Sequence, residues 1–287
     1  MPEMLIFLSL AGPEKNKEIM PNPQKIEFSA LSDIGKVRAH NEDAIVVCED
    51  YACAVLADGM GGYKAGEVAS AMATQIIAED LSRHFERRWL PHFRIRIKQL
   101  NRWLQEAIDH ANAQILRASQ ADPACFGMGT TVVVACFFED KLAISHVGDS
   151  RAYVFRQDRL IRLTYDHSVL QEQIDAGYIS EEQARFSAIK NLITRAVGTQ
   201  SYVQVEQHIH EVFDEDIVML CSDGLTDMLS HDEILQILEQ NKQDLPACCQ
   251  CLIAAANAQG GFDNVSVVLL RVPAVRAQSW LQRLTGR

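Results

Sequence analysis

The sequence has neither a surplus of basic residues nor a long apolar run. Of its 287 residues, 27 are Lys or Arg and 38 are Asp or Glu, which gives a formal net charge of −11 at pH 7. Nucleic-acid backbones and anionic lipid surfaces repel such a chain. The apolar segment at residues 4–11 is far shorter than the about 20 residues that span a bilayer, and Glu3 precedes it where a signal peptide would carry positive charge. We therefore expect a cytoplasmic protein with no nucleic-acid partner and no membrane span.

Cysteines in a metal-binding arrangement are also missing. Cys248 and Cys251 form one C-x-x-C pair, but no second pair or flanking histidine completes a zinc site. Most of the other cysteines lie inside apolar runs, where a free thiol behaves as a small hydrophobic side chain. We therefore expect free core cysteines in a reducing compartment. The eight cysteines are Cys48, Cys53, Cys125, Cys136, Cys221, Cys248, Cys249 and Cys251.

The composition is that of a globular protein. The chain is 48% hydrophobic and 23% charged, and its length suffices for one substantial core or at most two small ones. Gly and Pro residues interrupt regular structure before residue 26. We expect a flexible extension over 1–25, one domain over 26–272 and a basic tail over 273–287. The arginine-rich segment 83–96 is either a solvated helix end with its link or a docking site for an acidic partner.

Hydrophobic periodicity predicts a mixture of helices and antiparallel strands. Residues 66–82 and 97–118 carry apolar side chains at helical spacing, and helices are also expected at 231–240 and 246–258. Short apolar runs with tight turns between them predict antiparallel strands. These runs cover residues 26–32, 44–48, 54–57, 130–138, 141–147, 151–156, 160–163, 203–210, 217–221 and 265–272.

Acidic residues stand at the boundaries of these strands. Asp58 ends an apolar run, and three glycines follow within four positions, so bare backbone beside it can approach a ligand closely. The short link 49–51 joins this strand to the preceding one, which places Glu42 and Asp43 at the same rim as Asp58. Any single Asp-Gly pair is as readily a turn as a functional site. The full set at strand boundaries is Glu42, Asp43, Asp58, Asp149, Asp223 and Asp263.

Six carboxylates at one rim need compensation. Like charges gathered in a protein repel by several kcal/mol at its lower effective dielectric. Hard divalent cations, which prefer oxygen ligands, supply the compensating charge. The sequence therefore predicts a metal site at this rim of the sheets.

The motifs around these carboxylates resemble those of a known family, the metal-dependent protein Ser/Thr phosphatases of type 2C (the PPM class), and its compact bacterial members most closely. The resemblance covers nearly the whole of 26–272 and implies an α+β fold, a four-layer αββα sandwich of two antiparallel sheets flanked by helices. It also implies Mn²⁺ or Mg²⁺ as the cofactor. The motifs, in chain order, are RAHNED (38–43), ADGMGG (57–62), GTT (129–131), VGDSRA (147–152), CSDGLTD (221–227) and DN (263–264).

The same resemblance assigns roles to the residues at the rim. Asp58 bridges two metal ions, of which one is completed by Glu42 and the carbonyl of Gly59. The other ion is completed by Asp223 and Asp263. Asp43 orients a metal-bound water from behind the ligands. A third, looser ion is held by Asp149 with Asp223, and Asp227 is a further candidate ligand there. Arg38 grips the phosphate oxygens of the substrate.

The chemistry of the residues agrees with this reading. Paired cations neutralise a phosphomonoester and lower the pKa of a bridging water, which attacks phospho-Ser or phospho-Thr in line. The Arg38 guanidinium suits phosphate geometry better than a Lys would. No cysteine stands in a setting typical of a nucleophile. We therefore expect a monomeric protein phosphatase that acts on phosphorylated proteins, including a cognate Ser/Thr kinase that it opposes.

Some positions depart from the family pattern, and other readings stay open. Met60 stands where many eukaryotic relatives carry a histidine, so protonation of the leaving group falls to metal-bound water or to His40. Tyr63 stands where relatives often have a histidine. Residues 186–191 match the family's flap only loosely. A catalytically dead member acting as a binding module, and a different binuclear metallohydrolase, are the alternatives.

The polar segment 166–197 is the least regular part of the chain. It combines glycine, serine and mixed charge with few apolar residues, and segments with few buried contacts open at low cost in free energy. We expect a mobile flap beside the third metal site that governs protein substrates more than small ones. The alternative is an ordinary pair of surface helices.

Overall fold

The computed structural model describes residues 26–62, 65–86, 96–138, 140–180, 183, 187 and 192–273. The expectations for the extension 1–25, for Tyr63, for most of the basic segment 83–96, for most of the flap match 186–191 and for the tail beyond Pro273 lie outside these residues.

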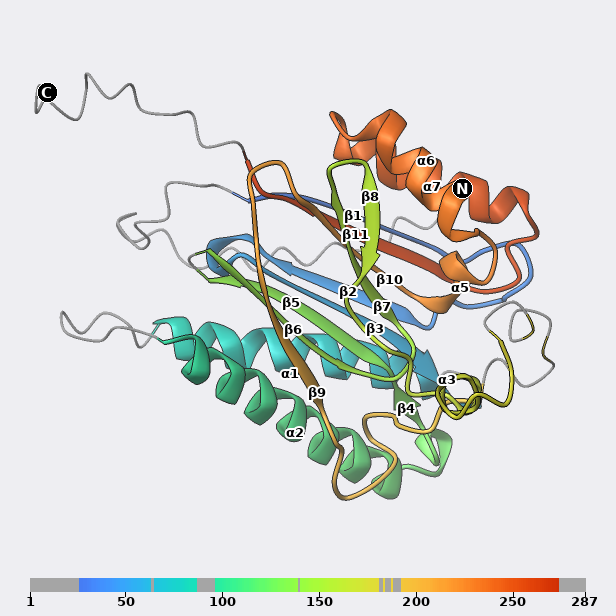
Figure 1. Cartoon of the computed structure of the whole chain (residues 1–287). Helices are drawn as coiled ribbons and strands as arrows, with labels where there is room; N and C mark the ends of the chain where they lie inside the picture. The colour runs from blue at the N-terminus through green and yellow to red at the C-terminus, as the bar shows by residue number, and fades with distance from the viewer. Residues whose placement is uncertain are drawn as a thin grey trace, which may run out of the picture.

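Two antiparallel sheets stack face to face, with helices on both outer faces (Figure 1). This is the predicted αββα sandwich. The first sheet has the order β1-β11-β10-β7-β8. Its strands are β1 (Glu27–Asp33), β7 (Arg151–Arg156), β8 (Arg159–Arg162), β10 (Ile217–Cys221) and β11 (Val265–Arg271).

The second sheet has the order β2-β3-β5-β6-β9, with the two-residue strand β4 paired to the end of β3. Its members are β2 (Asp43–Cys48), β3 (Cys53–Met60), β4 (Gly129–Thr130), β5 (Val132–Phe138), β6 (Lys141–Val147) and β9 (Glu206–Glu211). The 3-10 turn η1 (Glu49–Tyr51) joins β2 to β3. The predicted hairpin with this link is confirmed.

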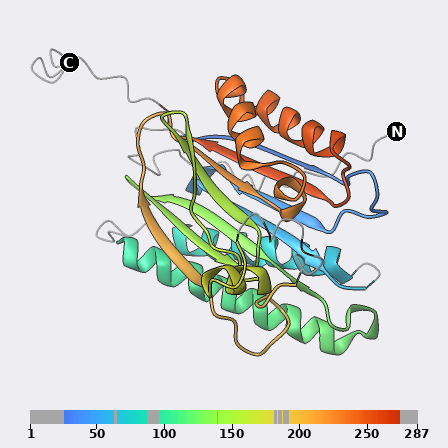
Figure 2. The ribbon, with the colours of Figure 1, turned by 45° about the vertical axis from the view of Figure 1, so that its right-hand side comes forward.

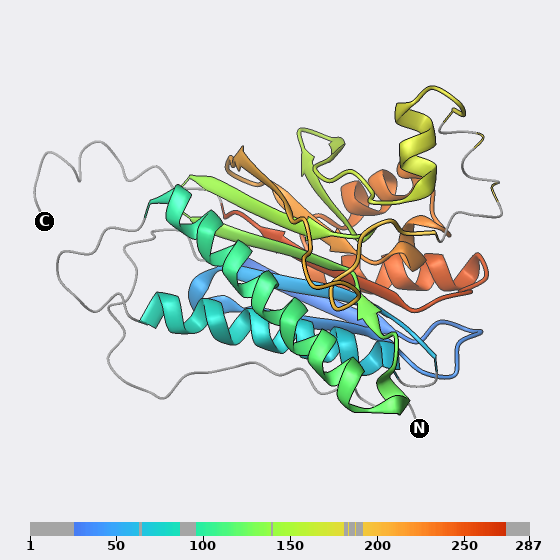
Figure 3. The same cartoon turned by 90° about the horizontal axis from the view of Figure 1, so that it is seen from below.

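Helices cover each sheet on its outer side. The long helices α1 (Ala65–Glu86) and α2 (Ile97–Ala121) lie across the second sheet, as seen from below in Figure 3. On the opposite side, α6 (His231–Asn241) and α7 (Leu245–Ala258) cover the first sheet (Figure 2). The shorter elements are η3 (Pro123–Cys125), α3 (Val169–Asp175) and α5 (Asp223–Thr226). None of the helices in the described part of the chain is both long and apolar enough to cross a bilayer.

Central strands are buried on both faces, which explains their continuous apolar runs. In β3, Val55 packs under α1 and α2, whereas its neighbour Leu56 packs between the two sheets. In β10, Met219 faces α6 and α7, and Leu220 faces the space between the sheets. The fold thus has three apolar layers between its four structural layers, and they hold the strand ends in fixed positions.

The helices form where apolar periodicity favours them and, in α6 and α7, where side chains cap the first turn. The apolar stripe of α2 packs against the sheet, with its middle buried and its ends, Ile97 and Ala118, partly buried. A capping box begins α6, because Ser230 accepts from the Glu233 N–H and the Glu233 carboxylate accepts from the Ser230 N–H. Asp244 caps α7 in a similar way, with its side chain accepting from the Ala247 N–H.

Two details of the fold differ from expectation. The single strand expected over 130–138 is divided at Thr131, because the Thr131 N–H donates to the Asp58 carbonyl (2.8 Å) outside the ladder.

The expectation that all core cysteines are free is wrong for one pair. Cys53 of β3 and Cys136 of β5 are direct cross-strand partners and form a buried disulfide. The other six cysteines carry free thiols.

The segment between β8 and β9 leaves the sheets and returns. It contains α3, and residues 192–198 then run back toward the second sheet. Single antiparallel bridges join Ser168 to Ile193 and Thr130 to Val197. The returning stretch is therefore tied to the same end of the sandwich as Asp58, whose carbonyl accepts from the Thr130 hydroxyl.

Candidate metal centre

Strand pairing brings the acidic residues of both sheets to one end of the sandwich. Asp43 of β2 lies directly opposite Asp58 of β3. Asp223 follows β10, and Asp263 precedes β11, its antiparallel neighbour. Asp149 lies between β6 and β7, and β7 is the other neighbour of β10. Segments far apart in the sequence thus deliver their carboxylates to one place.

These carboxylates raise one another's pKa. Burial is the largest cause at Asp58, whose pKa lies well above its ordinary value, and the charges of Asp43, Asp223, Asp149 and Asp263 raise it further. The pKa of Asp223 is raised in the same manner, by burial first and then by its acidic neighbours, Asp227 among them. Mutual repulsion of this kind is relieved when positive charge binds among the carboxylates.

One buried carboxylate oxygen has no hydrogen-bond partner. Asp43 is 6% exposed, and its Oδ2 accepts from the Ser222 hydroxyl at 2.8 Å. Its Oδ1 is buried and unpaired. Burial raises the pKa of Asp43 to about 6, against the lowering effect of its serine hydrogen bonds. An orphaned carboxylate oxygen among like charges fits a site for hard divalent cations or for water held by them.

Arg38 contributes positive charge at the rim of this cluster. Its Nη2 donates to Asp263 Oδ2 at 2.7 Å, and its side chain is 47% exposed. This hydrogen bond is the main cause of its raised pKa. The guanidinium is thus paired with one carboxylate oxygen of Asp263, a predicted metal ligand. A substrate phosphate could replace Asp263 as the partner of Arg38.

Two threonines fix the backbone of Asp58. The Asp58 N–H donates to Thr131 Oγ1 at 3.0 Å, and Thr130 Oγ1 donates to the Asp58 carbonyl at 2.8 Å. Thr131 Oγ1 also lies 2.7 Å from the hydroxyl oxygen of Ser150. Thr131 therefore links the strand that carries Asp58 to the turn that carries Asp149. The GTT motif was recognised in the sequence, but no role for it could be predicted there.

Two glycines let α1 approach the end of β3. A Cβ on Gly59 would lie 2.1 Å from the Gly66 carbonyl oxygen and 2.6 Å from that of Glu42. A Cβ on Gly66 would lie 2.8 Å from the carboxylate of Glu42. The Gly59 N–H donates to the Glu42 carbonyl at 3.0 Å. Sequence reasoning identified Gly59 and missed Gly66, since only the packing of the helix shows that position to be constrained.

Asn264 clamps the loop that carries Arg38 and Glu42. Its Nδ2 donates to the carbonyls of Ile34 and His40, both at 2.9 Å, and its Oδ1 accepts from the Glu42 N–H at 2.8 Å. Asn264 is 4% exposed. A buried asparagine with three main-chain partners positions the loop rather than reacts. In the sequence, Asn264 stood out only as the second residue of the DN motif, and no role was predicted for it.

A cavity opens beside the acidic cluster. It has a volume of about 730 Å³ and is lined by Asp149, Asp223 and Asp227 together with side chains of α3 and α6. Asp227 itself is exposed. Its charge raises the pKa of both Asp149 and Asp223. Met60 ends β3 and is half-buried, and the His40 side chain is exposed.

Comparison with known proteins agrees with the fold. Residues 49–265 match the model of the family "Protein phosphatase 2C". The serine/threonine phosphatase stp of Listeria innocua is 35% identical over 243 residues, which are 83% of this chain and 93% of the relative. The solved serine/threonine phosphatase of S. agalactiae superposes with a TM-score of 0.77 at 36% identity and covers 86% of this chain and 99% of its own.

A further solved structure carries metal. The catalytic domain of the phosphatase PstP, in complex with two manganese ions, superposes with a TM-score of 0.74 at 34% identity, covering 87% of this chain and 99% of its own. Fold and acidic cluster together define a metal-dependent phosphohydrolase. The chain belongs to the protein phosphatase 2C family and is a protein serine/threonine phosphatase.

Proposed function

We propose that the carboxylates at this end of the sandwich hold the divalent cations with which the chain hydrolyses phospho-Ser and phospho-Thr. The raised pKa of Asp58 carries the proposal, because four neighbouring carboxylates act on this one half-buried acid. In the proposed assignment Asp58 bridges two cations, Glu42 and the Gly59 carbonyl complete one, and Asp223 with Asp263 complete the other. The donor set contains oxygen atoms only, which suits Mn²⁺ or Mg²⁺.

The bound cations supply charge that neutralises the phosphate dianion and acidifies water. Arg38, on an exposed loop, binds and orients the phosphate, for which its fork provides two parallel donors. Asp43 has a free Oδ1 and a raised pKa. That oxygen can hold the attacking water and take its proton. Met60 has no proton to give, so the leaving oxygen is protonated by water or by His40.

Further parts of the proposal concern the surroundings of this centre. Asp149 and Asp223, with Asp227, hold a third and weaker cation next to the cavity. Residues 26–272 form the catalytic domain of a monomeric cytoplasmic enzyme. Its substrates are phosphorylated proteins, and a cognate Ser/Thr kinase is among them. The acidic lining of the cavity supports the third cation, and membership of the family supports phosphorylated proteins as substrates.

Metal-dependent turnover tests the proposal. The purified chain should hydrolyse p-nitrophenyl phosphate and phospho-Thr peptides with added Mn²⁺ or Mg²⁺ and lose both activities in excess EDTA. Undiminished activity in EDTA would refute the metal centre. Phosphopeptide binding without turnover, at saturating metal, would instead identify a catalytically dead member of the family.

A further inference from the structure

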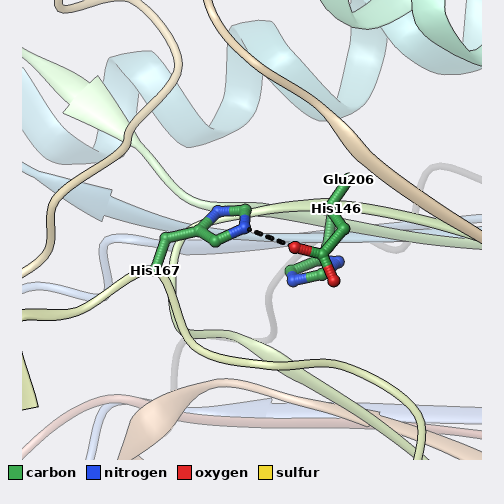
Figure 4. Close-up of side chains that lie close together, drawn as sticks. All are labelled: His146, His167 and Glu206. Atoms are coloured by element: carbon green, nitrogen blue, oxygen red, sulfur yellow. Dashed lines mark hydrogen bonds and ion pairs between the residues drawn. The ribbon is translucent and has the colours of Figure 1, made fainter. Parts of the chain in front are cut away.

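Imidazole and carboxylate side chains gather at the β6–β9 edge of the second sheet. His146 of β6 and Glu206 of β9 are cross-strand partners. The ring of His167 stacks on that of His146 with centroids 4.7 Å apart and an interplanar angle of 16°. Figure 4 shows the Glu206 carboxylate reaching toward the His167 ring. His146 is fully buried, and His167 is 6% exposed.

The hydrogen bonds of this cluster argue against a metal site. Its potential ligand atoms lie within 4.8 Å of one another, as in nitrogen-rich metal sites. However, the Gly148 N–H donates to His167 Nδ1 at 3.1 Å, so the hydrogen of the neutral ring is on Nε2. Nε2 therefore donates to Glu206 Oε2 at 3.2 Å. The Arg195 guanidinium lies 3.1 Å from the same nitrogen, where it contributes positive charge and no hydrogen bond, because Nε2 already carries a hydrogen. Both nitrogens of His167 are thus engaged, and a cation would meet Arg195.

His167 satisfies both main-chain polar groups of Gly148. Its Nδ1 accepts from the Gly148 N–H, and its own N–H donates to the Gly148 carbonyl at 3.0 Å. Gly148 has φ +102, and a Cβ there would lie 2.6 Å from the Thr131 side chain. The next residue in the chain is Asp149. The place of that carboxylate therefore depends on how firmly His167 holds this turn.

We propose that His167 and Glu206 are positioning residues for Asp149. Glu206 keeps the hydrogen of His167 on Nε2, which leaves Nδ1 free to hold Gly148 and thereby to fix the adjoining carboxylate for its cation. This inference rests on the proposed function, in which Asp149 binds the weaker third cation. Outer partners of this kind typically change metal affinity by about tenfold to a hundredfold when they are removed.

The surroundings keep the His167 ring neutral, as the arrangement requires. Burial lowers the pKa of His167, and the positive charge of Arg195 lowers it further, against the opposing effect of Glu206. A second proton would place an N–H at Nδ1 against the Gly148 N–H and open the turn. His146 Nε2 contacts the Tyr165 carbonyl at 2.8 Å, which anchors the chain just before His167. His208 Nε2 lies 2.7 Å from Glu206 Oε1 and holds that carboxylate from the other side.

The test compares Mn²⁺ binding, measured by titration calorimetry, with the Mn²⁺ dependence of p-nitrophenyl phosphate turnover. Glu206→Ala and His167→Ala should weaken the weakest Mn²⁺ binding step by about tenfold, while saturating Mn²⁺ restores most of kcat. Glu206→Gln keeps an acceptor for Nε2–H, and His167→Asn keeps an oxygen near the position of Nδ1. Both should lie closer to the unaltered chain than the alanine variants do.

Glu211→Ala is the matched control, since it removes a carboxylate from the same strand where Lys141 is the partner. It should leave Mn²⁺ binding unchanged. The proposal is overturned if Glu206→Ala binds Mn²⁺ as the unaltered chain does, or if Glu206→Gln is as impaired as Glu206→Ala. If the unaltered chain shows no Mn²⁺-dependent turnover, the phosphatase proposal fails, whereas the calorimetric comparison still decides the roles of His167 and Glu206.

Discussion

Burial and four neighbouring carboxylates all disfavour the charge of Asp58. Asp58→Asn removes a charged ligand while keeping the shape of the side chain. We expect turnover at saturating Mn²⁺ to fall by at least about a hundredfold, and Asp223→Asn should act similarly. Asp50→Asn, at the far end of the β2–β3 hairpin, should match the unaltered chain. Near-normal kcat in Asp58→Asn would remove Asp58 from the mechanism.

Arg38 presents a different case, since its partner Asp263 is itself a proposed metal ligand. Arg38→Ala should lower kcat/KM for phosphoesters by about tenfold or more, because a bidentate phosphate contact is lost. The affinity for Mn²⁺ should stay equal or increase, because Asp263 is released from its ion pair. Arg38→Lys keeps the charge without the fork and should recover part of the loss. Weaker Mn²⁺ binding in Arg38→Ala would show that Arg38 supports the metal site instead.

The sequence could identify residues whose chemistry is local and unusual, such as carboxylates next to glycines at strand ends. It could not assign roles to residues that act through distant contacts. Asn264 contacts main-chain groups of Ile34, His40 and Glu42, more than two hundred positions earlier. The role of Gly66 appears only once α1 packs on β3. Pairing of Cys53 with Cys136 likewise depends on the register of β3 and β5.

At the scale of elements, the close approach of α1 to β3 shapes the proposed ligand position of Gly59. Gly66→Ala would place a methyl group 2.8 Å from the Glu42 carboxylate and 2.9 Å from the Gly59 carbonyl carbon. Because backbone on one side cannot yield, we expect Mn²⁺ affinity to fall by about tenfold and stability by about 1–3 kcal/mol. Gly62→Ala, which meets nothing within 4 Å, is the control. Equal Mn²⁺ titrations for the two variants would contradict this account.

Strand and helix positions were largely predictable because apolar runs and helical stripes are local signals. β6, β7 and β10 match the predicted limits. The division between β4 and β5 was not predictable, since it arises from the hydrogen bonds of Thr131 with Asp58 across two strands. The start of β9 was expected three residues too early, because Val203 is buried without belonging to the ladder.

The excursion between β8 and β9 supplies α3, which lines the cavity beside Asp149 and Asp227. A protein substrate extends beyond its phosphate and can reach this cavity, whereas p-nitrophenyl phosphate cannot. Asp149→Ala, or shortening the excursion around Gly177, should therefore change phosphopeptide turnover by a different factor from p-nitrophenyl phosphate turnover. Equal effects on both substrates would mean that the excursion is scaffold and not a selective flap.

For the whole molecule, the acidic cluster makes stability depend on pH and metal together. The pKa values of Asp58 and Asp223 are raised by burial and mutual charge, so the metal-free folded state binds more protons than the unfolded state above about pH 4. The free energy of unfolding contributed by these groups therefore falls as pH rises through their raised pKa values. His146 acts in the opposite sense, because burial lowers its pKa to about 4. A melting temperature alone would mix both effects.

Comparing the unaltered chain with Asp58→Asn separates them, because His146 is common to both. In EDTA at pH 7.5, Asp58→Asn should melt higher than the unaltered chain, by about 2–4 °C for each kcal/mol of relieved repulsion. The advantage should shrink at pH 5.5, where protonation already relieves part of the repulsion. Excess Mn²⁺ at pH 7.5 should reverse the order, because only the unaltered chain keeps its full ligand set. If Asp58→Asn is no more stable in EDTA at pH 7.5, the carboxylates do not repel one another as inferred, and the case for cations at this centre loses its physical basis.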